Sequence, residues 1–104
     1  MNTNFGIIWL MTIGNLKPGM KIDYWGKARG KSGKKFVINS VSEKFISCDP
    51  PEAKHIQKVH RDDFEAVWEL WENYLAGKVQ RKNLIKVTRF SSYILSIFNH
   101  VFLD

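Results

Sequence analysis

Two segments of the sequence gather basic residues with no acidic residue among them. The first segment, residues 27–35, is interrupted by glycine and serine, and its cations are Lys27, Arg29, Lys31, Lys34 and Lys35. The second segment, residues 78–89, carries Lys78, Arg81, Lys82, Lys86 and Arg89. Each cation that neutralises a nucleic-acid phosphate releases condensed counterions, and this release favours binding. The two segments therefore predict a nucleic-acid interface, and a merely solvated basic loop is the alternative for the first of them.

The net charge of +6 is spread unevenly along the chain. Residues 1–61 carry 11 Lys and Arg against 4 acids, and residues 78–104 carry 5 against 1. Between them, residues 62–77 carry 5 acids and no Lys or Arg. This separation favours a polyanionic partner, and the alternative is an acidic helix that receives the basic loop of a second copy.

The last 43 residues run from an acidic helix through a glycine and a basic segment to an apolar helix. This order is typical of three packed helices, including those of the helix-turn-helix type. In a helix-turn-helix, the last helix would bring Ser92, Ser96 and Asn99 to base edges while nearby cations contact phosphates. That polar strip lacks arginine, the residue that most often reads guanine. The sequence therefore favours a plain helical cap packed on a sheet over base recognition.

Residues 26–32, Gly-Lys-Ala-Arg-Gly-Lys-Ser, have the composition of a phosphate-binding P-loop. Only three residues separate the two glycines, whereas the P-loop requires four between them and a helix after them. A strand is expected to follow here. The comparison therefore fails, and we expect no nucleotide site of this kind.

Other candidate chemistry is weaker still. The tripeptide Glu-Ala-Lys at residues 52–54 matches half of a restriction-type nuclease site, with Asp23 or Asp49 as the second metal-binding carboxylate. It directly follows two prolines, so we expect it on a turn that does not aim both carboxylates at one ion. The only cysteine and the histidines have no recognised zinc spacing. With no nucleophile and base brought together, we expect no enzyme, no metal and no cofactor.

The elements that position the basic segments begin with short strands. Residues 20–25 alternate apolar and polar side chains, the pattern of a half-buried strand. Residues 36–41 and 45–48 predict a hairpin, and residues 55–60 predict a last strand. Residues 26–35 are expected to form a loop.

Strands this short and sequential favour an antiparallel sheet or an SH3-like partial barrel over about residues 5–60. Within it, the residues ahead of Met11, which include most of the apolar run at residues 5–13, are expected to be an added edge strand or a non-essential extension. The run is too short to span a membrane as a helix.

Two to three helices are predicted to pack on this sheet, at about residues 62–76, 80–87 and 91–102. The first is expected to begin with a capping box of Asp62 and Glu65. Its apolar stripe, which should lie on the sheet, consists of Phe64, Val67, Trp68, Trp71 and Leu75.

Gly77 is expected to end the first helix as a left-handed cap residue. The last helix is so apolar that we expect it to be deeply buried or to pack on another subunit. Together the elements predict one α+β domain over residues 1–104, with a β-rich half (1–61) and a helical half (62–104).

The single cysteine, Cys48, and the lack of basic residues ahead of the first apolar run predict a cytoplasmic protein. As an alternative to nucleic-acid binding, the apolar faces of the last helix and of residues 5–13 predict a self-associating or partner-binding protein, with a homodimer expected.

The segment from Asp63-Phe64-Glu65 through Trp68, Trp71, Tyr74, Gly77 and Arg81 to Ser91-Ser92-Tyr93-Ile94 resembles the C-terminal part of small bacterial proteins of mobile elements, including integron gene cassettes. The resemblance implies a compact cytoplasmic bacterial protein. It carries no functional residue to this chain, because those proteins have no assigned activity.

Overall fold

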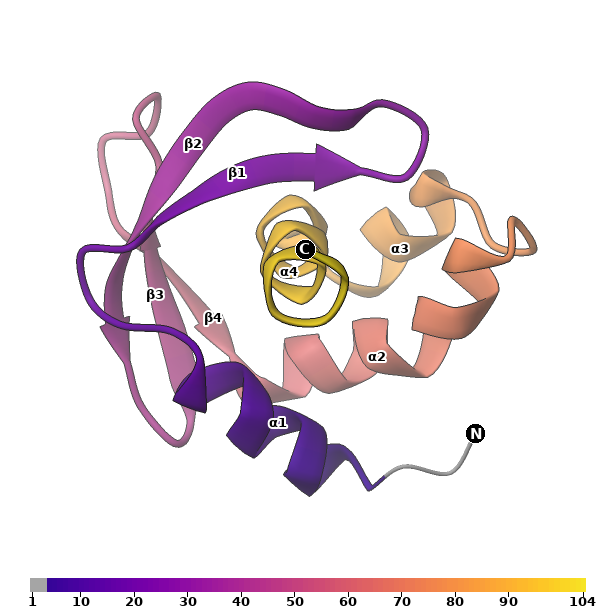
Figure 1. The fold of residues 1–104 in the computed structure, drawn as a ribbon, viewed down its shortest axis with the longest axis horizontal. Helices are drawn as coiled ribbons and strands as arrows, with labels where there is room; N and C mark the ends of the chain where they lie inside the picture. Colours follow the sequence, from indigo (N-terminus) through magenta and orange to yellow (C-terminus); the bar gives the residue numbers. More distant parts are fainter. Residues whose placement is uncertain (1–3) are drawn as a thin grey trace.

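A bent four-stranded sheet wraps around a central helix in the computed structural model, which describes residues 4–104 (Figure 1). Adjacent strands pair antiparallel in the order β1-β2-β3-β4, so the predicted α+β class is confirmed and the sheet is open. The elements are α1 (Phe5–Gly14), β1 (Lys21–Gly26), β2 (Gly30–Val41), β3 (Phe45–Asp49), β4 (Gln57–His60), α2 (Arg61–Leu75), α3 (Arg81–Val87), α4 (Ser91–Phe98) and a π-helical turn (Asn99–Leu103).

Irregular strand pairing gives the sheet its bend. The register between β1 and β2 shifts after Asp23, where β2 carries extra residues around Gly33. Gly33 has a φ of 87°, a conformation that glycine adopts without strain. A second shift lies between Ile38 and Ser40 of β2. Because extra residues increase the local twist and bend of a strand, the sheet curves around α4 (Figure 1).

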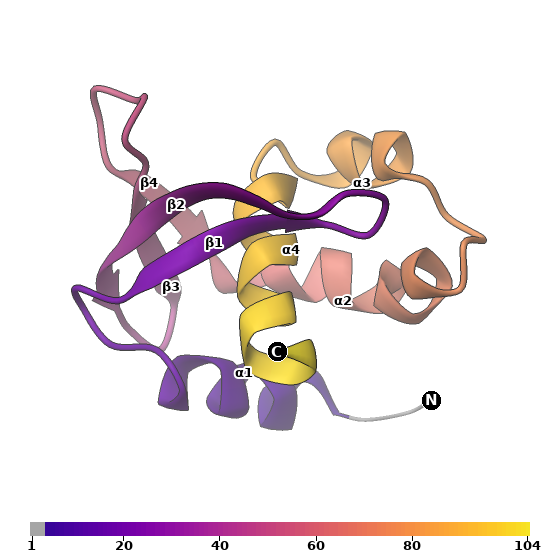
Figure 2. The ribbon, with the colours of Figure 1, turned by 45° about the horizontal axis from the view of Figure 1, so that its top comes forward.

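Helix α4 fills the hollow of the sheet. Ile94, Leu95, Ile97 and Phe98 are fully buried. In Figure 2, α4 stands between the strands on one side and α2 on the other. The expectation of a deeply buried last helix is confirmed, and its apolar residues are covered by this chain itself.

The prediction that Asp62 caps α2, as the first residue of a capping box, is wrong. The helix begins at Arg61, and Asp62 and Asp63 lie in its first turn, where their carboxylates oppose the positive end of the helix. The predicted end is confirmed: Gly77 has a φ of 81°, and the Lys78 N–H donates to the carbonyl oxygen of Asn73 at 2.8 Å.

The apolar stripe of α2 packs mainly on helices rather than on the sheet. The Phe64 ring meets the Phe98 ring of α4 at 5.8 Å and the Trp9 ring of α1 at 5.1 Å between centroids. Trp68 meets Phe98 at 5.4 Å. Trp71 also reaches the sheet, with its ring centroid 6.0 Å from that of Trp25 of β1. The stripe is thus an interior seam, but α4 lies between most of it and the strands.

The apolar run at residues 5–13 forms a helix, so the expected edge strand is wrong. The Asn4 side chain caps α1 by accepting a hydrogen bond from the Gly6 N–H at 2.7 Å. Trp9 is buried, and its indole N–H donates to the Glu43 carbonyl oxygen at 2.7 Å. None of the helices within residues 4–104 is long and apolar enough to cross a membrane.

The remaining predictions hold only in part. The hairpin of β2 and β3 turns at Ser42 and Glu43 as expected. The predicted loop at residues 26–35 is mostly strand, because β2 begins at Gly30. On α3, Leu84 is buried whereas Ile85 is exposed to solvent.

Candidate nucleic-acid interface

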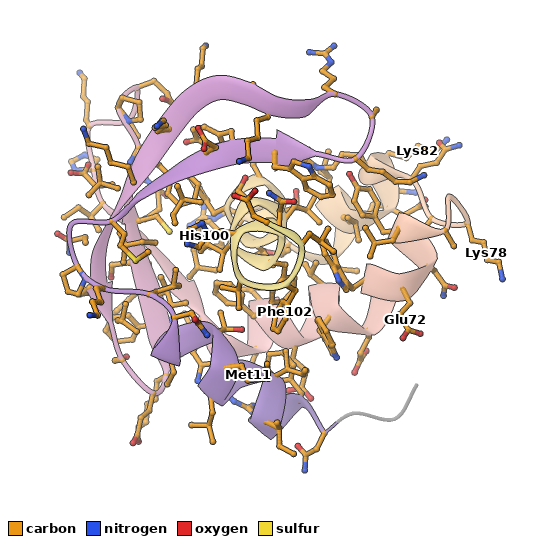
Figure 3. All side chains as sticks on the ribbon, viewed as in Figure 1. Met11, Glu72, Lys78, Lys82, His100 and Phe102 are labelled. Atoms are coloured by element: carbon orange, nitrogen blue, oxygen red, sulfur yellow. The ribbon has the colours of Figure 1, made fainter. Side chains whose placement is uncertain are left out.

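The two basic segments, far apart in sequence, meet at one corner of the molecule. Lys27 and Arg29 lie in the turn between β1 and β2, and this turn faces the connection between α2 and α3 (Figure 1). A Cβ placed on Gly77 would lie 3.5 Å from Lys27 Nζ. Figure 3 shows that Lys78 and Lys82 extend on this same side of the molecule. We refer to five of these cations together as the basic corner: Lys27, Arg29, Lys78, Arg81 and Lys82.

Two hydrogen bonds hold the β1–β2 turn against the helices. The Lys27 N–H donates to the Tyr74 hydroxyl oxygen of α2 at 3.0 Å. The Trp25 N–H donates to the Ser96 hydroxyl oxygen of α4 at 2.9 Å. Gly30, with a φ of 70°, allows the chain to turn back into β2. The turn is therefore fixed in place, which keeps Lys27 and Arg29 close to α3.

Two adjoining cavities open between the β1–β2 turn and the helices. The larger has a volume of about 430 Å³ and is lined by residues that include Trp25, Arg29, Ser32, Tyr74, Arg81 and Ser92. The second, of about 370 Å³, shares Tyr74 and Arg81 with the first and is also lined by Lys27. Residues of both predicted basic segments thus line one concave surface.

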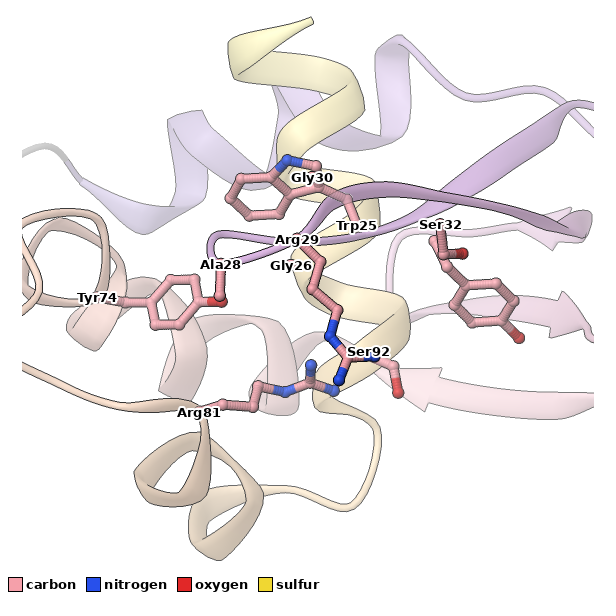
Figure 4. Close-up of a pocket in the computed structure, with 10 residues that line it drawn as sticks. Trp25, Gly26, Ala28, Arg29, Gly30, Ser32, Tyr74, Arg81 and Ser92 are labelled. Atoms are coloured by element: carbon pink, nitrogen blue, oxygen red, sulfur yellow. The ribbon is translucent and has the colours of Figure 1, made fainter.

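The guanidinium groups of Arg29 and Arg81 point into the same part of the larger cavity, next to Ser92 (Figure 4). Within the described part of the chain, neither arginine forms an ion pair. Arg81 Nη2 donates one long hydrogen bond, of 3.5 Å, to the Ser91 hydroxyl. Arg81 Nε is buried and has no hydrogen-bond partner among residues 4–104. Most N–H donors of the two guanidinium groups therefore form no hydrogen bond with the described residues.

Three lysines of the first basic segment lie outside the basic corner, along β2. Lys31 forms an ion pair with Asp104 at 2.9 Å, and this hydrogen bond raises the pKa of the Lys31 ammonium. Lys35 lies 3.9 Å from an Asp23 carboxylate oxygen. Lys34 is exposed. The two nearby carboxylates reduce the positive potential that this part of β2 offers to a phosphate.

In the second basic segment, Lys86 of α3 and Arg89 just after it are exposed. The Arg89 guanidinium lies over the Phe90 ring, 4.8 Å from its centroid. Neither residue lines the two cavities.

The expected base-reading strip on the last helix is corrected by burial. Ser96 is fully buried, and Asn99 is 7% exposed. The Ser96 hydroxyl donates to the Ser92 carbonyl oxygen at 2.7 Å while it accepts from Trp25. Because α4 is enclosed by the sheet and α2, it cannot enter a DNA groove in this fold. Of the three residues, Ser92 alone lines one of the two cavities described above.

Comparisons were made with protein-family models, curated proteins and solved structures. None of the three found a match. The resemblance to integron cassette proteins therefore stays a prediction.

The other candidate groups do not assemble into a site. Burial raises the pKa of the Cys48 thiol to about 12, so it is protonated at neutral pH and is not a nucleophile. Glu52 lies in the turn after β3, where it accepts a hydrogen bond from the Tyr24 hydroxyl at 3.2 Å. Burial first, and then Tyr93 and Glu52, raises the pKa of Tyr24. Among residues 4–104, no three His, Cys, Asp or Glu side chains are placed to hold a metal ion.

The sequence identified the cations but missed the aromatic part of the cavity. Trp25 and Tyr74 line it together with Tyr24. A signal for Tyr74 was present, because it follows Trp71 by three residues and so falls on the apolar stripe of α2. No local pattern indicates that Trp25 of β1 meets Tyr74, with ring centroids 6.4 Å apart.

Proposed function

We propose that this chain binds nucleic acid through the basic corner. The main support for the proposal is that the β1–β2 turn lies beside α3, so that Arg29 and Arg81 line one cavity, and neither forms an ion pair with any of residues 4–104. Cations held close together and free of carboxylates attract a polyanion more strongly than scattered, neutralised ones. The interface is non-catalytic, and it contacts the phosphate backbone rather than base edges.

The test compares two double variants that remove the same charge. Lys27→Gln with Arg29→Gln lies in the basic corner, and Lys44→Gln with Lys54→Gln lies in the connections at the opposite side of the molecule (Figure 1). All four side chains are exposed, so both variants should fold. We expect the first variant to bind a mixed-sequence duplex more weakly, by on the order of tenfold per cation removed. Fluorescence anisotropy at about 100 mM salt measures the affinity.

The control variant is expected to bind almost as tightly as the parent protein. Equal losses in the two variants would show that only the net charge matters, and they would contradict a localised interface. Absence of measurable duplex binding by the parent protein at low salt would end the proposal.

A second candidate function, self-association, is favoured by the outer face of α1. Ile7, Leu10 and Met11 are 56%, 65% and 46% exposed and share one face by their spacing. No residue of α1 is charged. A two-fold pair places the same surface of each copy against the other, so an uncharged apolar face meets its partner without repulsion. A second copy of this chain is therefore the occupant that we propose.

Ile7→Glu is expected to convert a dimer to a monomer, because it buries two unpaired carboxylates at the two-fold interface. Ile56→Glu is the matched control, since Ile56 is similarly exposed, at 49%, but lies outside α1. Sedimentation velocity at high protein concentration measures the mass. A monomeric parent protein would refute self-association through α1.

A further inference from the structure

The larger cavity of the basic corner differs from a flat phosphate-contacting surface in shape and in lining. Its volume of about 430 Å³ far exceeds the space that a phosphate group occupies. Two guanidinium groups and the Ser92 side chain line one part of it (Figure 4). The aromatic residues Tyr24, Trp25 and Tyr74 line other parts. The cavity thus combines anion-binding groups with aromatic residues on more than one of its sides (Figure 4).

The positive charge in the cavity is not balanced by a carboxylate of residues 4–104. Arg29 and Arg81 direct two positive charges to one place, and no described carboxylate pairs with either. Two like charges brought to the same part of a cavity repel each other. Arg81 also has a buried Nε without a partner. An anion seated between the two guanidinium groups would relieve the repulsion and use their free donors.

The amount of charge indicates which anion fits. A backbone phosphate diester carries one negative charge, whereas a terminal phosphate monoester carries about −1.5 to −2 at pH 7. Arginine pairs with phosphate through two parallel hydrogen bonds, and two arginines together match the charge of a dianion. A hydroxyl such as that of Ser92 can donate one more hydrogen bond. The pair therefore suits a monoester better than a diester.

We propose that this cavity binds a phosphate monoester carried by a nucleoside, as found at the phosphorylated end of a nucleic-acid strand or in a free mononucleotide. The phosphate lies between Arg29 and Arg81, and the nucleoside lies in the rest of the cavity, against its aromatic residues. Aromatic side chains favour bases of any sequence, because every base offers a flat face. For the strand end, the inference rests on the proposed function, and it adds that the end of a strand is preferred over its interior.

The test uses short single-stranded oligodeoxynucleotides of one sequence with a 5′-phosphate, with a 3′-phosphate or with neither. We expect one phosphorylated form to bind about tenfold more tightly than the unphosphorylated form, as charge-assisted hydrogen bonds to a dianion predict. Arg29→Gln is expected to abolish this difference, and its exposed position on the turn should spare the fold. Lys54→Gln, which removes one exposed charge outside the cavity, is expected to retain the difference.

Further arms separate this inference from the proposed function. Equal affinity for all three oligonucleotides, with salt-dependent duplex binding intact, would overturn the inference and leave the proposed function standing. Binding of a free nucleoside monophosphate that Arg29→Gln abolishes, without binding of strands or duplex, would support the cavity and refute the interface. Competition by inorganic phosphate as strong as that by the mononucleotide would overturn the role of the aromatic residues.

Discussion

Replacing Phe98 by alanine is expected to lower the free energy of unfolding by about 3–5 kcal/mol. The Phe98 ring is fully buried, and it meets the rings of Trp68 and Trp71 at 5.4 Å each. It also meets Phe64 at 5.8 Å and Phe102 at 5.9 Å. Truncation would leave a cavity among large rigid rings that cannot move together to fill it. Since small domains have a total stability of about 5–15 kcal/mol, much of this variant would be unfolded at elevated temperature.

Urea unfolding followed by tryptophan fluorescence and circular dichroism measures this loss for Phe98→Ala. The matched control is Leu103→Ala, in the helical turn that follows α4, where the side chain is 50% exposed. We expect the control to shift the free energy of unfolding by about 0.5 kcal/mol or less. If both variants unfolded at the same urea concentration as the parent protein, α4 could not be the centre of the core.

The affinity for duplex DNA is expected to fall roughly 500-fold when the salt concentration rises from about 50 to about 200 mM. The basic corner offers five cations, Lys27, Arg29, Lys78, Arg81 and Lys82. If each neutralises one phosphate, the logarithm of the association constant falls with the logarithm of salt with a slope of about −4.5. A fourfold change in salt then gives the stated loss. Such steepness would mark phosphate contacts as the main source of affinity.

Anisotropy titrations of a labelled duplex at several salt concentrations measure this slope. The variant with Lys27→Gln and Arg29→Gln should have a slope shallower by about 1.8, because two counterion-releasing contacts are lost. The variant with Lys44→Gln and Lys54→Gln should keep the slope of the parent protein. A parent slope shallower than about −2, or a slope that the first variant leaves unchanged, would place the contacts elsewhere.

The sequence predicted best those elements in which one face is apolar and the other is polar. The spacing of Phe64, Val67 and Trp71 identified α2, and Gly77 identified its end. These signals are local, since they follow from helix geometry and from the conformational freedom of glycine. The hairpin of β2 and β3 was predicted for the same reason.

The run at residues 5–13 was misjudged because almost every residue in it is apolar. Such a run has no periodicity that separates a helix from a strand. The outcome depended on the Asn4 cap and on the packing of Trp9 against Phe64 of α2. The second of these is a tertiary contact and leaves no trace in the local sequence.

The candidate site was predictable in its composition but not in its shape. The cations were visible in the sequence, yet the sequence did not show that Arg29 would meet Arg81 while Lys31 and Lys35 lie beside carboxylates. Burial removed Ser96 from the predicted interface. Each of these outcomes depends on how the sheet bends around α4, which is a property of the whole fold.

The central position of α4 also sets the order in which the core can form during translation. All four strands and α2 precede α4 in the chain, so they leave the ribosome before the helix that fills the hollow of the sheet. Until it emerges, Phe36 of β2 lacks its ring contact with Tyr93, which lies at 5.2 Å in the finished fold. Nascent chains with uncovered apolar strands are prone to aggregate and to recruit chaperones. The sheet of this protein is therefore exposed to these hazards until α4 has been synthesised.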